Sequence, residues 1–218
     1  MCSGADRALA GVERLGNEEH VSIFPQPRYI HSMKKHVFLA LIWLCIALAV
    51  SAEAPWPQLT PEQWATLTPQ QLKAKLSDGY DLQQRDGVGM TALMRAVQHT
   101  RDPEIVTMLV NAGSLVDVRD EGRWTPLIRA ARSNPNPAVH ALLIAAGADV
   151  NARNMADYTA LIWAVRENPN PEVLELLLDA GANPALQGVD GRRAVDFLPD
   201  NSALTGSRAA MRLMSSGP

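Results

Sequence analysis

Two histidines, His99 and His140, are the residues after position 53 that are best suited to acid–base chemistry or metal binding. Either task needs further groups at close range, such as a nucleophile, a carboxylate or additional metal ligands. No acidic cluster at ligand spacing accompanies either histidine. We therefore expect two isolated histidines, at the surface or partly buried, without a catalytic or metal-binding role.

Four aspartates, Asp86, Asp117, Asp120 and Asp149, look at first like a set of catalytic carboxylates. Aspartate is also a common turn residue, because its side chain accepts hydrogen bonds from its own backbone a few positions on. We expect this structural role for all four. The chain has no glycine-rich phosphate loop after a strand and no G-x-S-x-G nucleophile motif. The sequence therefore predicts no enzyme activity, no cofactor and no metal.

The composition is that of an ordinary globular protein. The 218 residues carry a formal net charge of −3, and 47 % of them are hydrophobic. This length suffices for one domain with a substantial core, and the composition differs from the low hydrophobicity and high charge of disordered chains. The slight acidity argues against a nucleic-acid partner, since proteins that bind nucleic acids usually carry a basic surplus.

Residues 33–54, MKKHVFLALIWLCIALAVSAEA, show the three parts of a secretory signal peptide. A lysine pair is followed by an uncharged apolar run and then by small residues. Cleavage after Ala52 is favoured over cleavage after Ala54, because Pro55 would directly follow the second cut. The alternative is a signal anchor that stays in the membrane, although the apolar run is shorter than the ~20 residues that a span needs.

The segment before this signal, residues 1–32, shows no apolar periodicity. We interpret it as the product of an over-extended start codon or, if it is translated, as an unstructured tail. Both cysteines, Cys2 and Cys45, precede the predicted cut. The processed chain would therefore contain neither disulfides nor thiolate metal ligands.

Three stretches of the chain repeat one another with a period of 34 residues, beginning at Thr91, Thr125 and Thr159. Glycines recur at the same step, as Gly79, Gly113, Gly147 and Gly181. A period in this range is typical of a solenoid of stacked supersecondary units. In each unit the threonine can cap a first helix, and apolar residues at three- and four-residue steps indicate a second helix. The glycine then closes this second helix in a left-handed conformation.

The unit resembles an ankyrin repeat, through Thr125-Pro126-Leu127, Ala130-Ala131, Leu142-Leu143 and the run AGADVN at residues 146–151. The resemblance covers residues 56–214 and implies an all-α solenoid of stacked helix–turn–helix units with short β-turn fingers. Two departures are present. The period is 34 rather than the common 33, and the histidine usual after T-P-L is replaced by apolar residues, namely Met94, Ile128 and Ile162. The replacement implies apolar packing between repeats, and both departures suit a bacterial branch of the family.

Divergent capping repeats are expected at both ends, because one face of each terminal repeat meets water. Thr60 and Thr68 each precede a proline and stand three residues before a glutamine, which is the pattern of a helix capping box. At the other end, Arg193 falls in register with the cap threonines, and a final helix is expected from Ser202 to Met214. The predicted domain spans residues 53–218, with an N-terminal cap (56–88), three full repeats (89–122, 123–156, 157–190) and a C-terminal cap (191–214).

The resemblance also implies a concave protein-binding face, formed by the finger tips and the exposed side of the first helices. Large amphipathic side chains in the finger column are of the types enriched at interface hot spots, and the first helices add a row of arginines. The candidate binding residues are Met90, Arg95, Trp124, Arg129, Arg132, Tyr158, Trp163, Arg166 and Arg192, with Gln98, His99, Ser133 and Glu167 in the same columns. The alternative is that the aromatic rings only pack on neighbouring fingers and that the arginines form a solvated face.

These features predict a non-catalytic, monomeric, exported scaffold, periplasmic or secreted, that binds another protein through an apolar patch with acidic surroundings. A second hypothesis is a membrane-tethered module held by an uncleaved signal, the only part expected to touch a membrane. An enzyme would require an activity that depends on His99 or His140. Within the first class, some exported bacterial ankyrin proteins resemble stress-protection factors and others immunity proteins, and the sequence does not choose between them.

The tetrapeptide NPNP occurs twice, at residues 134–137 and 168–171. The repeat register places it at the corner between the two helices of a unit. Asn134 and Asn168 are expected to end the first helix in a left-handed conformation, and the prolines after them stop that helix. Asn136 and Asn170 are expected to cap the second helix, so that replacing Asn136 with alanine should cost about 1 kcal/mol.

Overall fold

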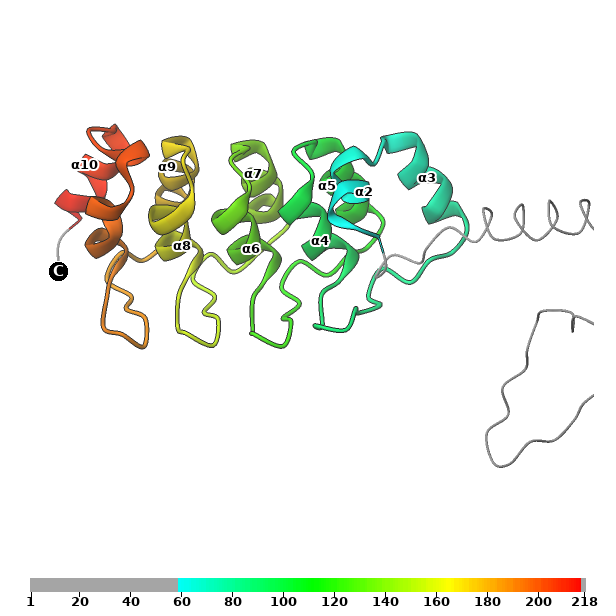
Figure 1. Cartoon of the computed structure of the whole chain (residues 1–218), viewed down its shortest axis with the longest axis horizontal. Helices are drawn as coiled ribbons and strands as arrows, with labels where there is room; N and C mark the ends of the chain where they lie inside the picture. Colours follow the sequence, from blue (N-terminus) through cyan, green and yellow to red (C-terminus); the bar gives the residue numbers. More distant parts are fainter. Residues whose placement is uncertain (1–58, 217–218) are drawn as a thin grey trace, which may run out of the picture. The chain divides into compact units, whose positions relative to one another are not determined.

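The computed structural model of the protein describes residues 59–216, and these residues form a row of helix pairs (Figure 1). The predicted N-terminal extension, signal peptide and cleavage site lie outside the described residues. The elements, in chain order, are α2 (Pro61–Thr66), α3 (Pro69–Ser77), α4 (Ala92–His99), α5 (Pro103–Asn111), α6 (Pro126–Ser133), α7 (Pro137–Ala145), α8 (Ala160–Glu167), α9 (Pro171–Asp179), the 3₁₀ helices η3 (Ala194–Asp200) and η4 (Ser202–Leu204), and α10 (Arg208–Ser215).

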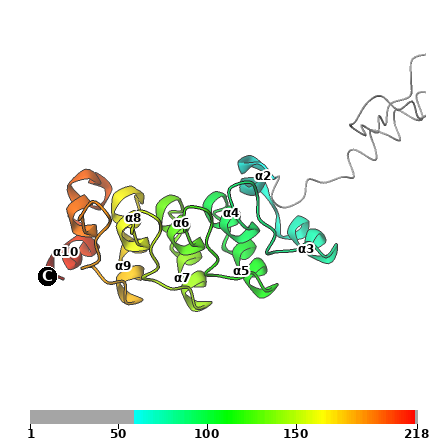
Figure 2. The ribbon, with the colours of Figure 1, turned by 90° about the horizontal axis from the view of Figure 1, so that it is seen from below.

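The helices lie in two layers, as the view from below shows (Figure 2). The first helices of the units, α2, α4, α6 and α8, form one layer, and the second helices, α3, α5, α7 and α9, form the other. Extended loops project from the same side of each unit as fingers (Figure 1). Residues 59–216 contain no strand, and an isolated antiparallel bridge joins Gln187 and Arg193. The expected all-α solenoid of helix–turn–helix units is confirmed.

The helix starts follow the capping residues that the sequence indicates. Thr91, Thr125 and Thr159 accept a hydrogen bond from the backbone N–H three residues on, as helix N-caps do. Thr60 and Thr68 form complete capping boxes with their glutamines. Because these signals are local, they fix the helix starts without help from the rest of the fold.

The core is a continuous apolar layer between the two rows of helices. Leu93, Leu127 and Leu161, one repeat apart, are fully buried on the first helices. The residues that replace the histidine of the family pattern, Met94, Ile128 and Ile162, are also buried. This agrees with the expected apolar packing between repeats at these positions. At the end of α7, Gly147 has a φ of +92°, which glycine adopts without steric strain.

The NPNP corner carries a ladder of asparagine amides that joins consecutive repeats. Asn134 donates from Nδ2 to the carbonyls of Val97 (2.8 Å) and Thr100 (2.7 Å) in the preceding unit. Asn168 repeats this pattern on the carbonyls of Ala131 and Asn134. Asn201 extends the same ladder into the C-terminal cap, where it donates to the carbonyls of Val165 and Asn168.

Two expectations about this corner have different outcomes. Asn134 and Asn168 have extended backbone conformations, with φ of −105° and −85°, so the expected left-handed conformation is wrong. Asparagine is needed there for its buried amide, which reaches the neighbouring repeat. The caps are confirmed, because Asn136 and Asn170 accept hydrogen bonds from the backbone N–H two residues on. Asn136 also donates to the carbonyl of Arg101 (2.8 Å), so the cap residue links repeats as well.

A second ladder runs through the fingers in the opposite direction. Arg85 and Arg119 each donate from Nη1 to the backbone carbonyl of the residue 34 positions later, Arg119 and Arg153. Arg153 donates likewise to the carbonyl of Gln187. From the second repeat onward the asparagine ladder therefore ties a repeat to the one before it, and up to the third repeat the arginine ladder ties a repeat to the one after it.

The C-terminal cap departs from the predicted helix between Ser202 and Met214. The chain first forms η3, in the place of a first helix, then the short η4, and α10 begins only at Arg208. Pro199 lies inside η3, and proline lacks the N–H that a regular α-helix would need there. Ser207 caps α10, which starts six residues later than predicted. Within residues 59–216, no helix is both long enough and apolar enough to cross a bilayer.

An arginine–aromatic stack on the first helices and fingers

The predicted binding residues differ in how far their side chains are exposed to solvent. The side chains of Arg132, Arg166 and Arg192 are 47 %, 41 % and 42 % exposed. Met90 and Tyr158, predicted to face solvent, are buried, with 3 % and 8 % of their surface exposed. The expected solvent-facing finger column is therefore wrong at these two positions, and Tyr158 packs edge-on against Trp163 and Phe197 instead. Trp163 is also largely buried, while Trp124 is half-buried.

The finger turns are built by aspartates that bond their own backbone, as predicted. Asp86 Oδ1 accepts hydrogen bonds from the N–H groups of Val88 (3.0 Å) and Met90 (2.9 Å). Asp120 Oδ1 accepts from the N–H of Trp124 (2.9 Å). Asp149, in the loop after α7, accepts from its own backbone too, while Asp117 instead accepts from the N–H of Asp149, 32 residues away. The predicted bonding to the local backbone is therefore confirmed for Asp86, Asp120 and Asp149 and is wrong for Asp117, whose carboxylate binds the backbone of the next repeat.

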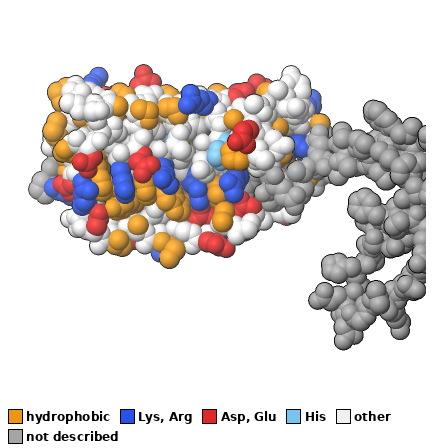
Figure 3. Space-filling view, in the orientation of Figure 1, with side chains coloured by type: hydrophobic (Ala, Val, Ile, Leu, Met, Phe, Trp, Pro, Cys, Tyr) orange, Lys and Arg blue, Asp and Glu red, His pale blue; other side chains and the backbone are white. Residues whose placement is uncertain are grey.

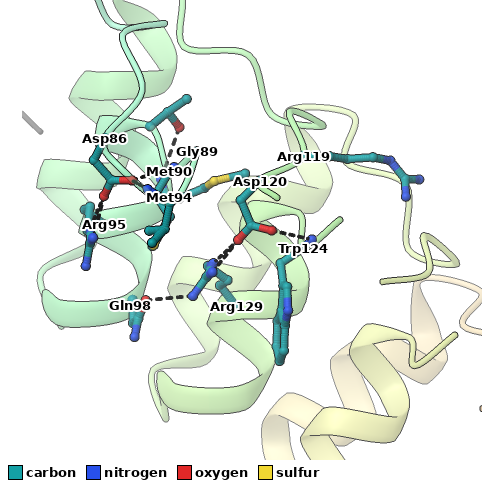
Figure 4. Close-up of polar contacts among 12 residues, drawn as sticks. Asp86, Gly89, Met90, Met94, Arg95, Gln98, Arg119, Asp120, Trp124 and Arg129 are labelled. Carbon is teal, nitrogen blue, oxygen red and sulfur yellow. Dashed lines mark hydrogen bonds and ion pairs between the residues drawn. The ribbon is translucent and has the colours of Figure 1, made fainter. Parts of the chain in front are cut away.

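Each finger aspartate also fixes an arginine of the following first helix (Figure 4). Arg95 pairs with Asp86, and its Nε lies 2.8 Å from Oδ2. Arg129 pairs with Asp120 at 2.9 Å and additionally donates to Gln98 Oε1 at 3.2 Å. Burial alone would raise the pKa of Asp86, but the backbone and Arg95 hydrogen bonds outweigh it and hold that pKa below its usual value. These two predicted binding arginines are therefore largely occupied within the fold.

Aromatic rings from neighbouring repeats lie against one another across the first helices. The rings of Trp124 and Trp163 have centroids 4.7 Å apart, and those of Tyr158 and Trp163 are 5.5 Å apart at an interplanar angle of 70°. Tyr158 contacts Phe197 in the same edge-on manner, at 5.8 Å. Such pairs stabilise a fold beyond their buried area. The aromatic residues thus connect the second repeat, the third repeat and the C-terminal cap.

Arginines are interleaved with these rings. The guanidinium carbon of Arg132 lies 5.5 Å from the ring centroid of Trp124 and 4.9 Å from that of Trp163. Arg166 lies 5.0 Å from Trp163 and 5.6 Å from Phe197, and Arg192 lies 3.7 Å from Phe197. These distances are those of cation–π contacts. We call this set the arginine–aromatic stack; it consists of Trp124, Arg129, Arg132, Tyr158, Trp163, Arg166, Arg192 and Phe197.

Phe197 is the member of the stack that the sequence analysis missed. It lies 34 residues after Trp163, in the column that also holds Arg95 and Arg129. Extending that column into the C-terminal cap would have found it. Its neighbour Tyr158 donates a hydrogen bond to Asp190 Oδ2 at 2.6 Å and lies against Gly188, where any side chain would overlap the ring. Burial, followed by this bond, raises the pKa of Tyr158 above its ordinary value, so the hydroxyl remains a donor.

The surface above the stack is hollowed between the first helices. A hollow of about 270 Å³ is lined by Gln98, Trp124, Arg129, Arg132, Ser133 and Glu167. In the space-filling view, Lys and Arg side chains alternate with hydrophobic side chains in a band along the row of repeats (Figure 3). This mixture of apolar rings and guanidinium groups suits contact with a protein surface, because arginine and large aromatic residues are enriched where interface energy is concentrated.

The two histidines lie in different repeats, His99 at the end of α4 and His140 within α7. His140 is fully buried in α7, against the expectation of a surface or partly buried residue, and its Nδ1 lies 3.0 Å from the carbonyl of Asn136. Burial, only partly offset by backbone hydrogen bonds, lowers the pKa of His140. His99 is half-buried at the end of α4, and burial lowers its pKa too, together with nearby Arg95. Among residues 59–216 no three His, Cys, Asp or Glu side chains are placed to hold a metal ion.

Paired short helices at a constant 34-residue step, joined by projecting fingers, define the chain as a repeat protein that presents a surface along its length. Comparison with protein families identifies the repeat. A family model of ankyrin repeats in three copies matches residues 68–154, and a model of the single ankyrin repeat matches residues 157–188. The chain belongs to the ankyrin repeat family, whose members are generally non-catalytic modules of protein–protein interaction. A search of curated proteins found no match.

Proposed function

We propose that this protein is an exported, non-catalytic ankyrin scaffold that binds a partner protein over the arginine–aromatic stack. The observation that carries the proposal is the stack itself. Trp124, Arg132 and Arg166 present partly exposed rings and guanidinium groups from two consecutive repeats beside a hollow. Aromatic and arginine side chains of this kind, held rigid before binding, lose little conformational freedom when a partner docks.

The stack also stabilises the fold, so a test of binding must distinguish loss of the interface from loss of folding. Tyr158 and Trp163 are buried, so replacing either would disturb the packing of repeats as well as any interface. Trp124 is half-buried, contacts Trp163 on one side and borders the hollow on the other. Trp124 is therefore the aromatic residue whose replacement tests binding with the least damage to the fold.

The test is capture of partners by cross-linking in the native cell, using the wild-type chain, W124A and M211A. Met211 is 55 % exposed on α10, away from the stack, and serves as the matched control. We expect a partner that is captured by the wild type and M211A but lost with W124A, while thermal unfolding shows that W124A remains folded. Equal capture by all three folded proteins would reject the stack as the binding surface.

Export is supported by the signal-like segment at residues 33–54. We propose a bacterial protein that is cleaved after Ala52 and released as a monomer into the periplasm or the medium, where it acts in stress protection or as an immunity protein. The alternative is a module tethered by an uncleaved signal. N-terminal sequencing of the protein purified from its own cells separates the two: a start near Glu53 supports release, and a retained apolar segment supports the tether.

A further inference from the structure

Arg132 has unused hydrogen-bond donors at the edge of the stack. Its Nε donates to Glu167 Oε2 at 2.8 Å, and this is its only hydrogen bond to a residue that the structure describes. Both terminal nitrogens are therefore available, on a side chain that is 47 % exposed. Its guanidinium lies within cation–π distance of both Trp124 and Trp163, whose rings contact each other, and these contacts restrict the side chain.

Arg166, one repeat later, has even fewer hydrogen-bond partners than Arg132. It makes no hydrogen bond with any residue between 59 and 216, and the carboxylate oxygen paired with it, Glu167 Oε1, is 3.8 Å from its Nε. The rings of Tyr158, Trp163 and Phe197 surround its guanidinium at 5.0–5.8 Å. Rings satisfy the face of a guanidinium but not its in-plane N–H groups, which remain free to bind an acceptor.

The other arginines of this surface are already bonded. Arg95 and Arg129 pair with Asp86 and Asp120, and Arg192 donates to the carbonyl of Asp196 and to Asp200. Free donors are thus concentrated on two arginines one repeat apart, which share a single carboxylate, that of Glu167. Two cations and one anion leave a local positive charge on a chain whose net charge is −3.

We propose that the partner binds the stack as an extended acidic peptide segment, with one carboxylate on Arg132 and another on Arg166. This inference rests on the proposed function and specifies the partner's chemistry. A carboxylate matches the paired donors of a guanidinium in a bidentate arrangement. The hollow beside Trp124 is otherwise lined by Gln98, Arg129, Arg132, Ser133 and Glu167, so it suits a polar side chain of the same segment. A nucleic acid fits less well, because its unbroken row of phosphates would also lie beside Glu167, Asp190 and Asp200, whereas a peptide can place its carboxylates at Arg132 and Arg166 alone.

The test is a selection from a random linear peptide library displayed on phage, using the whole protein as bait. We expect the selected peptides to be enriched in Asp and Glu. Their affinity, followed through tryptophan fluorescence, should fall roughly tenfold or more for R132Q and for R166Q, because each change removes a charge-assisted hydrogen-bond pair. R208Q is the matched control, since Arg208 is 88 % exposed on α10 and remote from the stack.

The outcomes separate this inference from the proposed function. Two results would reject the acidic segment while supporting the binding surface. In the first, the selected peptides bind W124A weakly but are not acidic. In the second, they bind W124A weakly but bind R132Q and R166Q as tightly as the wild type. If W124A binds the selected peptides as tightly as the wild type does, both the acidic segment and the proposed binding surface are rejected. A selection that yields no peptide overturns the extended segment. Preferential binding of a single-stranded oligonucleotide over the selected peptides, under the same salt conditions, would overturn the choice of partner class.

Discussion

Asn134 shows how strongly one buried amide can bind two repeats together. Its side chain is buried, donates to the carbonyls of Val97 and Thr100, and accepts from the N–H of Asn136. Neither carbonyl can turn to water when the amide is removed, so both would lose their partner in a buried position. The loss of such partners costs more than the net value of the hydrogen bonds themselves.

We predict that N134A lowers the free energy of unfolding by about 3 kcal/mol, from the cost of unpaired buried polar groups. N136A should lower it by about 1 kcal/mol, as expected for the loss of an N-cap at a less buried position. N134D, which keeps the shape and the acceptor but not the donors, should be at least as harmful as N134A. Urea denaturation measures all three. Equal losses for N134A and N136A would contradict the role assigned to the ladder.

His140 gives the stability of the protein a specific dependence on pH. The carbonyl of Asn136 can only accept, so Nδ1 of His140 carries the hydrogen, and the neutral ring is the buried form. Its pKa is lowered in the folded chain from the ordinary 6.5, chiefly by burial. Below that ordinary value, the unfolded chain takes up a proton that the folded chain does not, so stability falls as the pH drops.

The prediction is that wild-type stability decreases between about pH 7 and pH 5 and that H140L shows a smaller decrease, since it has no imidazole to protonate there. Urea midpoints at these two pH values provide the measurement. His99, retained in H140L, and carboxylates with a lowered pKa such as Asp86 contribute to any remaining slope in this range. Identical slopes in wild type and H140L would show that His140 does not titrate differently on unfolding.

At the scale of the element, the finger depends on a carboxylate that serves two purposes. Asp120 accepts the N–H of Trp124 through one oxygen and the guanidinium of Arg129 through the other. In the third repeat Asn154 makes the same turn, accepting from Tyr158, and the residue nine positions later is Trp163 instead of arginine. The turn therefore needs only an acceptor, whereas the ion pair is specific to repeats that carry the arginine.

We predict that D120N preserves the finger turn but lowers the free energy of unfolding by about 2 kcal/mol, because Arg129 loses its charged partner. D149N is the control: Asp149 lies in an exposed loop, and an amide oxygen can still accept from the N–H of Asn151. We expect little change there. Chemical denaturation measures the free energy of unfolding of both variants. If D120N is as stable as D149N, the ion pair between Asp120 and Arg129 does not stabilise the fold.

The helix starts of the full repeats could be predicted from the sequence because each depends on residues within three positions, such as Thr125 before Pro126. The buried state of Tyr158 could not, since it depends on a ring contact with Phe197 and a hydrogen bond to Asp190, both more than 30 residues later. The same is true of Asn134, whose amide is needed for carbonyls 34 and 37 residues earlier. The arginine row of the binding site was visible in the sequence, but which arginines remain free depends on Asp86, Asp120 and Glu167 in three dimensions.

At the scale of the whole molecule, each repeat is stable only against its neighbours, so the ends determine how the row unfolds. The C-terminal end is covered by α10, which buries Ala209, Ala210 and Leu213 against the preceding elements. Without this cover, the apolar faces of α9 and η3 would meet water, and η3 in turn covers α8. The cap therefore protects the third repeat, which carries Tyr158, Trp163 and Arg166 of the arginine–aromatic stack.

We predict that L213D detaches α10 and weakens the third repeat first, with faster amide hydrogen exchange in α8 and α9 than in α4 and α5. A charge at this buried position cannot be solvated without opening the helix. M211D, two residues away on the exposed side of α10, should leave exchange unchanged. Uniformly faster exchange over all helices in L213D would instead indicate a row that unfolds as one unit.

The two ladders also bear on how such a chain can change its length. Each ladder advances by 34 residues per step and ties one unit only to the unit beside it. A gene segment encoding residues 123–156, if copied in tandem, would bring with it both the donors and the acceptors that a new junction requires. Duplication could lengthen this protein one unit at a time without redesign of its interior, and the two caps would be inherited unchanged.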